Sequence, residues 1–322
     1  MRLAPQERNP HERLEGLALK NEWRVLKRID KSTESSGGFF SCGYIVEKAN
    51  GQRGYLKALD FYSRLPESYD PARDLEPLIR AFNFERDLLL ECNNRKLSHV
   101  VVALDDGAVA VVVPEEPSPL TVQYIIFELA EGDVRSQMAE VDKLDSAWIF
   151  RSLHHIALGL DQLHSMNVAH QDLKPSNVLL FDKHESSKVA DLGRAAAKGI
   201  ESPHYNYDIP GDRSYAPPEL LYGTIPDSWD QKKLGCDAYL LGSMICSFFT
   251  GVALTPLLMM RLEPRMHWMQ WQGTYADVLP YLHAVFADAL DYIVEEFPPD
   301  FKSELREVLE QLGNPDPELG RQ

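Results

Sequence analysis

Cysteine is scarce in this sequence of 322 residues, and its four cysteines lie far apart, at positions 42, 92, 236 and 246. They form no Cys-x-x-Cys pair and have no histidine nearby at the spacing of metal ligands, so we expect buried, reduced thiols. Residues 1–20 lack the apolar core of a signal peptide, which predicts a cytoplasmic protein. We also find no internal repeat and no low-complexity tract.

Basic residues are too few to balance the acidic ones. The 33 Lys and Arg face 49 Asp and Glu, which gives a formal net charge of −16. Nucleic acids and anionic membranes are therefore not expected as partners, because both attract positively charged surfaces. The hydrophobic share of 44% is large enough for a sizeable core and for two lobes.

Long runs without a charged residue are also rare. One such run, residues 238–260, is long enough to raise the question of a membrane span. Its length would suffice for a membrane span. Thr250, Gly251 and Pro256 interrupt it, and several Ser and Thr residues lower its hydropathy. We interpret it as a helix buried on all sides, with a membrane span as the minor alternative.

The stretch HQDLKPSNVLL, residues 170–180, concentrates polar side chains ahead of an apolar run. Pro175 disfavours an α-helix, and Asn177 favours a turn. The residues from Val178 to Phe181 are typical of a short buried strand. Asp172 and Lys174 are therefore predicted to lie on a loop that a rigid scaffold displays.

This stretch resembles the catalytic loop of protein kinases, His-Arg-Asp-Leu-Lys-x-x-Asn. The resemblance implies that Asp172 accepts the proton of the attacking hydroxyl, Lys174 steadies the transferring phosphoryl group and Asn177 binds a metal ion. The Lys two residues after the Asp is the pattern of Ser/Thr kinases. Gln171 stands where the family usually has Arg.

Three downstream motifs follow in the order that the family requires. In KVADLGRA, residues 188–195, Asp191-Leu-Gly resembles the magnesium-binding Asp-Phe-Gly motif. GDRSYAPPEL, residues 211–220, resembles the end of an activation segment, with Asp212 in place of the usual Thr. Asp212 could pair with Lys174 or crowd Asp172, and the sequence leaves both possibilities open. In CDAYLLG, residues 236–242, Asp237 corresponds to the residue that supports the catalytic-loop backbone.

Upstream, RGYLKALDF at 53–61 resembles the strand that carries the ATP-binding lysine, here Lys57. FNFERDLLLEC at 82–92 is predicted to form an amphipathic helix in which Glu85 is the partner of Lys57. Glu76 and Glu91 are weaker alternatives, because Pro77 disfavours a helical residue before it and Glu91 lacks a supporting argument. The polar stretch 63–77 is interpreted as an inserted loop.

The nucleotide-binding segments match the family less closely. Residues 35–48, SSGGFFSCGYIVEK, depart from the usual glycine-rich pattern, although small residues there would let backbone N–H groups approach phosphates. Residues 121–138 resemble the strand and hinge that bind adenine, and Asp133 either contacts the ribose or caps the following helix. The predicted cofactor-binding residues are Gly37, Gly38, Ser41, Lys57, Glu128, Ala130 and Asp133.

The resemblance implies an α+β, two-lobed protein-kinase-like fold. We expect an N-terminal extension at 1–22, a small lobe of antiparallel strands with one helix at 23–130, and a mainly helical large lobe at 131–322. ATP would lie in the cleft between the lobes. Mg²⁺, or alternatively Mn²⁺, would be held by Asn177 and Asp191.

The function implied is transfer of the ATP γ-phosphoryl group to Ser or Thr hydroxyls of a protein substrate. One alternative is a pseudokinase that serves as a binding or scaffold module. A second is a small-molecule kinase of the aminoglycoside or choline type, although such enzymes generally lack the Pro-Glu end of the activation segment. Because neutral Gln171 cannot pair with a phosphate, we expect activity without phosphorylation of that segment. Oligomeric state is left open.

Overall fold

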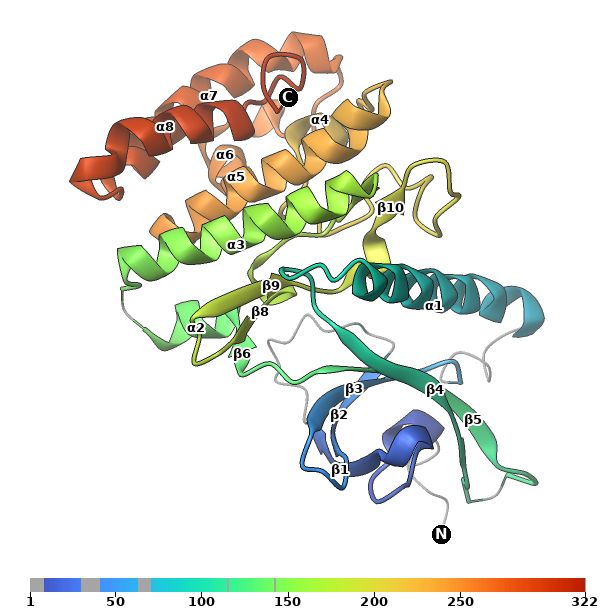
Figure 1. Cartoon of the computed structure of the whole chain (residues 1–322). Helices are drawn as coiled ribbons and strands as arrows, with labels where there is room; N and C mark the ends of the chain where they lie inside the picture. Colours follow the sequence, from blue (N-terminus) through green and yellow to red (C-terminus); the bar gives the residue numbers. More distant parts are fainter. Residues whose placement is uncertain (1–8, 30–40, 63–70, 115, 142, 322) are drawn as a thin grey trace. The chain divides into compact units, whose positions relative to one another are not determined.

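The structure is a computed structural model that describes residues 9–29, 41–62, 71–114, 116–141 and 143–321. The chain divides into two compact units (Figure 1). Residues 1–96 and 101–130 make up the first, and residues 97–100 and 131–322 make up the second. The first contains an antiparallel sheet and one long helix, while the second is mainly helical, so the predicted α+β fold class is confirmed.

The sheet of the first unit has five antiparallel strands in the order β1-β2-β3-β5-β4. A single helix, α1, follows β3 in the chain and contacts β4. Within residues 9–23, two short 3-10 helices precede β1, and the first of them, η2, contacts β2 and β5. The bounds are η2 Pro10–Glu12, η3 Lys20–Glu22, β1 Arg24–Ile29, β2 Ser41–Glu47, β3 Arg53–Leu59, α1 Pro71–Asn94, β4 Ala103–Val111 and β5 Leu120–Glu128.

Alternation along the strands decides which side chains enter the core of this unit. Successive residues of a strand point to opposite faces of the sheet. On β3 the buried positions are Gly54, Leu56 and Ala58, so Lys57 lies on the other face. On β2 the large buried side chain is Tyr44, which packs with Leu56 in the same cluster.

Helix α1 begins earlier than the sequence predicted. We expected a loop over residues 63–77, but residues from Pro71 onward are helical, and Pro77 lies inside the helix. Pro77 removes one backbone hydrogen bond, yet the buried side chains of Phe82 and Leu89 keep the helix packed on its unit. Residues 63–70 lie outside the described residues.

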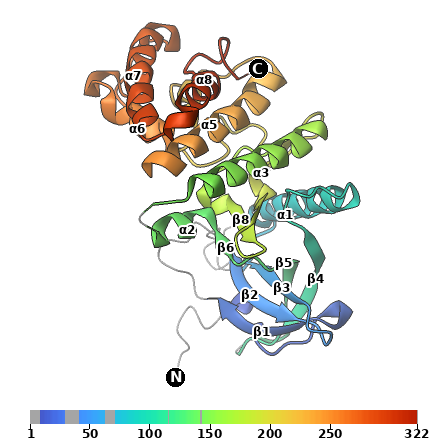
Figure 2. The same cartoon turned by 60° about the vertical axis from the view of Figure 1, so that its left-hand side comes forward.

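The second unit is built around helices α3 and α5, which lie side by side in Figure 1 and Figure 2. Helix α5 also contacts α6, α7 and α8. Short strands form two small sheets with the orders β6-β8-β9 and β10-β7. The bounds are β6 Gly132–Asp133, α2 Val134–Glu140, α3 Ser146–Ser165, β7 Val168–Ala169, β8 Val178–Phe181, β9 Ser186–Val189, β10 Ala196–Ala197, α4 Pro218–Leu221, α5 Gly235–Thr250, α6 Leu254–Arg261, α7 Tyr275–Glu295 and α8 Lys302–Leu312.

The uncharged run at 238–260 forms most of α5 and α6, and its apolar side chains pack into a hydrophobic core cluster of the second unit. Helix α5 has buried residues on every side, as its sequence predicted. Among the described residues, no single helix meets the length and hydropathy of a membrane span. Taken together, Asp230–Thr250 and Leu254–Arg261 do meet them, but the chain bends by 79° between the two segments.

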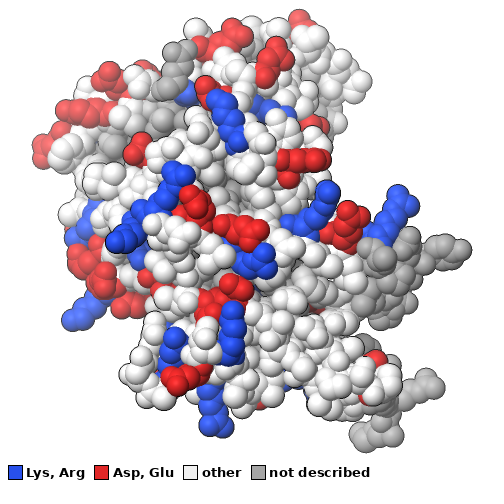
Figure 3. Space-filling model, turned by 45° about the vertical axis from the view of Figure 1, so that its right-hand side comes forward, with Lys and Arg blue, Asp and Glu red and all other residues white. Residues whose placement is uncertain are grey.

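Charged side chains of both signs are interspersed on the face that Figure 3 presents. Many of the acidic residues are paired. Asp288 contacts Arg261, and Asp291 and Glu310 both contact Arg306. These acidic side chains are thus neutralised locally, although the net charge of the chain, which already counts its Lys and Arg, stays at −16.

Candidate active site

Lys57 and Glu85 form an ion pair within the first unit. Lys57 Nζ lies 2.9 Å from Glu85 Oε1 and 3.1 Å from Oε2. Glu85 is 5% exposed, and it shares a helix face with Phe82 and Leu89 because these residues are three and four positions away. The pair joins β3 to α1 and fixes the position of the lysine ammonium group.

The two other glutamates considered as partners of Lys57 have arginine partners instead. Glu76 pairs with Arg80 and Glu91 pairs with Arg95, each one helical turn away on exposed parts of α1. Their side chains are about half exposed or more. They are thus ordinary solvated positions of the helix.

The catalytic-loop sequence folds as predicted, with a 3-10 turn at Pro175–Asn177 that leads into β8. Asp237 of α5 supports the preceding backbone, because its carboxylate accepts the N–H groups of His170 and Gln171, each at 2.7 Å. His164 Nε2 lies 2.9 Å from the same carboxylate. Asp237 is completely buried, so this loop is anchored to the helical core.

Asp172 lies at the centre of a short polar network. Lys174 Nζ approaches its carboxylate at 3.2 Å, and the side-chain amide of Asn177 donates to its Oδ2 at 3.1 Å and to its carbonyl oxygen at 2.7 Å. Burial raises the pKa of Asp172 above its ordinary value, while the Lys174 charge and the N–H of Asp212 act in the opposite direction. The carboxylate is therefore shielded from solvent but held by several donors.

The position of Asp212 answers the question that the sequence left open. Its backbone N–H donates to Asp172 Oδ1 at 2.8 Å, and its own carboxylate lies 3.6 Å from Lys174 Nζ. Asp212 thus pairs with Lys174 and supports Asp172 through its backbone. Lys174 is shared between two carboxylates as a consequence.

Gly211 makes this approach possible. A Cβ atom on Gly211 would lie 2.3 Å from the carbonyl oxygen of Gln171 and 2.8 Å from Asp172 Oδ1. Both distances are shorter than van der Waals contact, and the first partner is backbone. Only glycine fits here without a shift of the catalytic loop.

Asn177 and Asp191 are the predicted metal ligands, and both belong to the second unit. The Nδ2 atom of Asn177 is used in hydrogen bonds to Asp172, which leaves Oδ1 as the acceptor atom. The backbone N–H of Ala190 donates to the carbonyl of Asn177 at 2.9 Å, so the segment before Asp191 is tied to the loop. Asp191 has a φ of 62°, a left-handed conformation that is unfavourable for a residue with a Cβ.

Oxygen donors of this kind suit a hard cation such as Mg²⁺. Gln171 also has a positive φ, of 68°. Two non-glycine residues in the left-handed region, Gln171 and Asp191, therefore flank the network around Asp172.

The remaining predicted nucleotide-binding residues are only partly described. Gly37 and Gly38 lie outside the described residues, whereas Ser41 is the first residue of β2. Glu128 ends β5, and its N–H donates to the carbonyl of Val102 at 3.0 Å. Ala130 follows as the last residue of the first unit.

Asp133 caps helix α2 in the second unit. Its Oδ1 accepts the N–H of Ser136 at 2.8 Å and the Ser136 hydroxyl at 3.1 Å. This is the capping alternative that the sequence offered.

Sequence reasoning did not assign His164, Arg194 or His204. His164 belongs to no motif, and only the fold brings it to Asp237. Arg194 donates to the ring of His204 at 3.0 Å. Burial, together with this guanidinium group, lowers the pKa of His204 to about 4, so the ring is a neutral acceptor at physiological pH.

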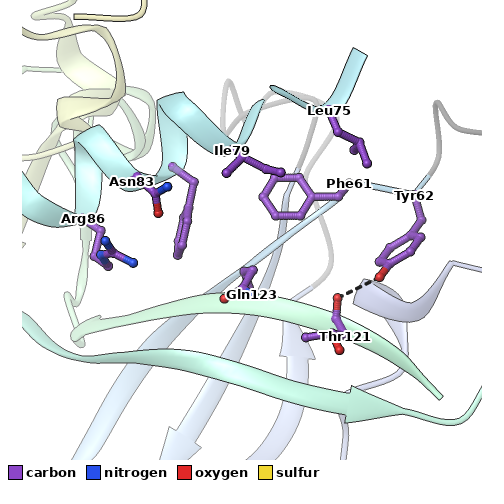
Figure 4. A pocket seen from close by; sticks show the side chains of 9 residues that line it. Phe61, Tyr62, Leu75, Ile79, Asn83, Arg86, Thr121 and Gln123 are labelled. Carbon is purple, nitrogen blue, oxygen red and sulfur yellow. Dashed lines mark hydrogen bonds between the residues drawn. The ribbon is translucent and has the colours of Figure 1, made fainter. Parts of the chain in front are cut away.

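The first unit also has a pocket of about 340 Å³ beside α1 and β5 (Figure 4). Phe61 and Phe82 meet edge to face in its wall, with ring centroids 6.4 Å apart, and the Tyr62 hydroxyl donates to the carbonyl of Thr121 at 3.1 Å. None of the predicted catalytic or metal-binding residues lines it. The pocket is therefore separate from the predicted catalytic residues of the first unit, Lys57 and Glu85.

Comparison with known proteins identifies the family. The sequence model described as Protein kinase domain matches residues 85–318. The match starts at Glu85, so the strand with Lys57 precedes it.

Individual relatives are similar over shorter stretches. Serine/threonine-protein kinase DCLK1 of Rattus norvegicus is 29% identical over 144 residues, which are 43% of this chain and 31% of that protein. Mitogen-activated protein kinase 7 of Arabidopsis thaliana is 33% identical over 142 residues, 42% of this chain and 36% of the relative. Cyclin-dependent kinase 1 of Encephalitozoon cuniculi is 34% identical over 104 residues, 31% of this chain and 34% of the relative. The matched part spans about a third of each of these relatives.

Proposed function

The chain belongs to the protein kinase domain family, and on this premise we propose that it transfers the γ-phosphoryl group of ATP to Ser or Thr hydroxyls of a protein substrate. The observation that carries the proposal is the network in which buried Asp172 contacts Lys174, Asn177 and the backbone of Asp212. A carboxylate held in this way can accept a proton from a hydroxyl group. The pairing of Lys57 with Glu85 supports the same reading.

Phosphoryl transfer requires little covalent chemistry from the protein. Negative charge spreads over the oxygens of the transferring group, so catalysis depends on positioning and on nearby cations. In the proposed reaction Lys57, oriented by Glu85, holds the α- and β-phosphates. Lys174 neutralises the γ-phosphoryl group, and Asp172 orients the acceptor hydroxyl and takes its proton.

A divalent metal ion is part of the family's chemistry, and Mg²⁺ is the ion we propose, with Mn²⁺ as an alternative. Asn177 Oδ1 and the Asp191 carboxylate would hold it, because hard cations prefer oxygen ligands. When bound, the ion neutralises charge on the phosphate oxygens. The amide nitrogen of Asn177 is already engaged with Asp172, which leaves the oxygen for this task.

The pseudokinase alternative predicts that one or more of these groups is missing or displaced. Lys57, Glu85, Asp172, Lys174 and Asn177 instead occupy mutually consistent positions within their units. The activation-segment end favours a protein substrate over a small alcohol. Pro218 and Glu219 begin helix α4 there, in the pattern that small-molecule kinases generally lack.

The direct test is phosphoryl transfer from radiolabelled ATP in the presence of magnesium to a basic protein substrate. Asp172→Ala is expected to lower the rate by about 10²–10⁴-fold while the chain stays folded. Asp227→Asn is the matched control, because Asp227 is exposed. Asp172→Ala with wild-type turnover would contradict the assignment. Absence of label with the wild type would favour a pseudokinase, or a small-molecule kinase if an alcohol such as choline is labelled.

We further propose that the enzyme is active without phosphorylation of its activation segment. The side-chain amide of Gln171 donates to the carbonyl of Lys233 at 2.9 Å, and it carries no charge with which to bind a phosphate. Phosphatase treatment should therefore leave the rate unchanged. A large loss of activity, restored by rephosphorylation of residues 202–214, would refute this.

A further inference from the structure

Three metal-ligating side chains meet in the first unit, away from the proposed catalytic residues. His11 and Glu12 come from helix η2, and Cys42 comes from β2. One donor atom from each lies within 4.8 Å of the other two. His11 and Cys42 are each 4% exposed, so two of the three donors are inside the fold.

The imidazole of His11 is held in place by its neighbours. Its Nδ1 lies 3.3 Å from the carboxylate of Asp60, which is also buried. The hydroxyl of Tyr44 donates to the carbonyl of His11 at 2.8 Å and fixes the backbone. A carboxylate this close to a histidine either orients the ring or can itself join the ligands of a bound ion.

The charges around the cluster are consistent with a divalent cation. Glu12, Asp60 and a Cys42 thiolate would contribute three negative charges. Arg28, whose guanidinium lies 3.0 Å from Glu12, contributes one positive charge. A divalent ion with a neutral His11 would bring the sum to zero, which matters because unbalanced buried charge is costly.

We propose that His11, Glu12 and Cys42 bind a divalent transition-metal ion, with Zn²⁺ as the favoured ion. Thiolate, imidazole and carboxylate together are the ligand set of zinc, whereas Mg²⁺ and Ca²⁺ prefer oxygen ligands alone. At zinc bond lengths the donors would be roughly 3.3–3.8 Å apart. The side chains would thus close by about 1 Å on binding, and water or Asp60 would provide the fourth ligand.

The cluster is invisible to motif analysis, because Cys42 is distant in sequence from His11. The fold brings them together when η2 packs on β2. A bound ion would cross-link the segment before β1 to the sheet. It would therefore stabilise the first unit, and its binding would release protons from the thiol and from any protonated imidazole.

The experiment uses the full chain, stripped of metal with a chelator and then titrated with Co²⁺. We expect one equivalent to bind and to produce a thiolate-to-cobalt charge-transfer absorption that Zn²⁺ abolishes by competition. Cys42→Ser should lack this absorption, whereas Cys92→Ser, which removes another buried thiol of the same unit, should keep it. Zn²⁺ should raise the unfolding temperature of the wild type and of Cys92→Ser, but not of His11→Gln.

The proposal does not depend on any variant folding, because the wild-type titration alone can refute it. A wild-type chain that gives no charge-transfer absorption with Co²⁺ would overturn the site. An absorption that persists unchanged in Cys42→Ser would also do so, since the thiolate ligand would then lie elsewhere. Phosphoryl transfer can be measured on the same samples, so failure of the metal site is distinguishable from failure of the proposed activity.

Discussion

Replacing Arg321 by Met is expected to destabilise the second unit strongly. The guanidinium group of Arg321 donates to Glu219 and to the carbonyl of Asn314, and it lies over the ring of Tyr239 at 4.7 Å from the centroid. The side chains of Arg321 and Glu219 are 1% and 2% exposed. The two side chains thus form a fully buried ion pair.

The size of the effect follows from the carboxylate that is left behind. Breaking a buried ion pair by removing one partner costs about 3–5 kcal/mol, because the other charge stays buried without compensation. We therefore expect Arg321→Met to lose about 4 kcal/mol of unfolding free energy at pH 7.

Urea denaturation followed by circular dichroism measures this loss, and a double-mutant cycle isolates the pair. Glu219→Gln combined with Arg321→Met should recover much of the stability, since no buried charge remains. Arg306→Met is the control, because Arg306 is 39% exposed and its ion pairs are worth less than about 1 kcal/mol. The reasoning fails if Arg321→Met is within 1 kcal/mol of wild type, or if the double variant is no more stable than the single one.

Three further outcomes are expected. Gly211→Ala should lower the rate of phosphoryl transfer by about 10²-fold, because the added Cβ displaces the catalytic loop. Gly132→Ala is the control and should leave the rate unchanged, because a Cβ at Gly132 meets no atom within 4 Å. Asp212→Asn should lower kcat/KM for a basic peptide relative to a neutral peptide by about fivefold, because one carboxylate beside Lys174 loses its charge. An unchanged ratio of the two kcat/KM values would count against this prediction. His204 has a pKa lowered to about 4, so its contribution to stability is complete above pH 6.5 and is lost as the pH falls toward 4. His204→Gln should therefore lose less stability than wild type between pH 7 and pH 5 in urea titrations, and identical pH profiles would refute this.

Helix α1 begins at Pro71, within the stretch that local sequence rules predicted to be a loop. Local rules read residues 63–77 as a loop because Pro71 and Pro77 are poor interior helix residues. Residues 73–81 of α1 are exposed or half-buried, and side chains are buried only from Phe82 onward. The first turns are therefore helical as a continuation of the packed part of the helix, because adding a residue to an existing helix costs less than starting one.

Asp212 illustrates a second limit. The sequence showed that Asp212 departs from the family pattern. It did not show whether the Asp212 carboxylate pairs with Lys174 or crowds Asp172. The distances of 2.8 Å from its N–H to Asp172 and 3.6 Å from its carboxylate to Lys174 decide between them. Differences of a few ångströms determine whether a charged group stabilises or repels its neighbour, and only the tertiary structure provides such distances.

The sequence by itself determined the order of the motifs and, through them, the family, the loop character of 170–177 and the buried character of helix α5. These features are local, because a proline, a run of apolar residues or an ordered motif acts over a few residues. The sequence also favoured Glu85 as the partner of Lys57 and Asp237 as the support of the catalytic loop. Only the tertiary structure decided that His164 contacts Asp237 and that His11 lies beside Cys42. Such contacts join residues far apart in the chain, and they depend on how helices and strands pack rather than on any short stretch of sequence.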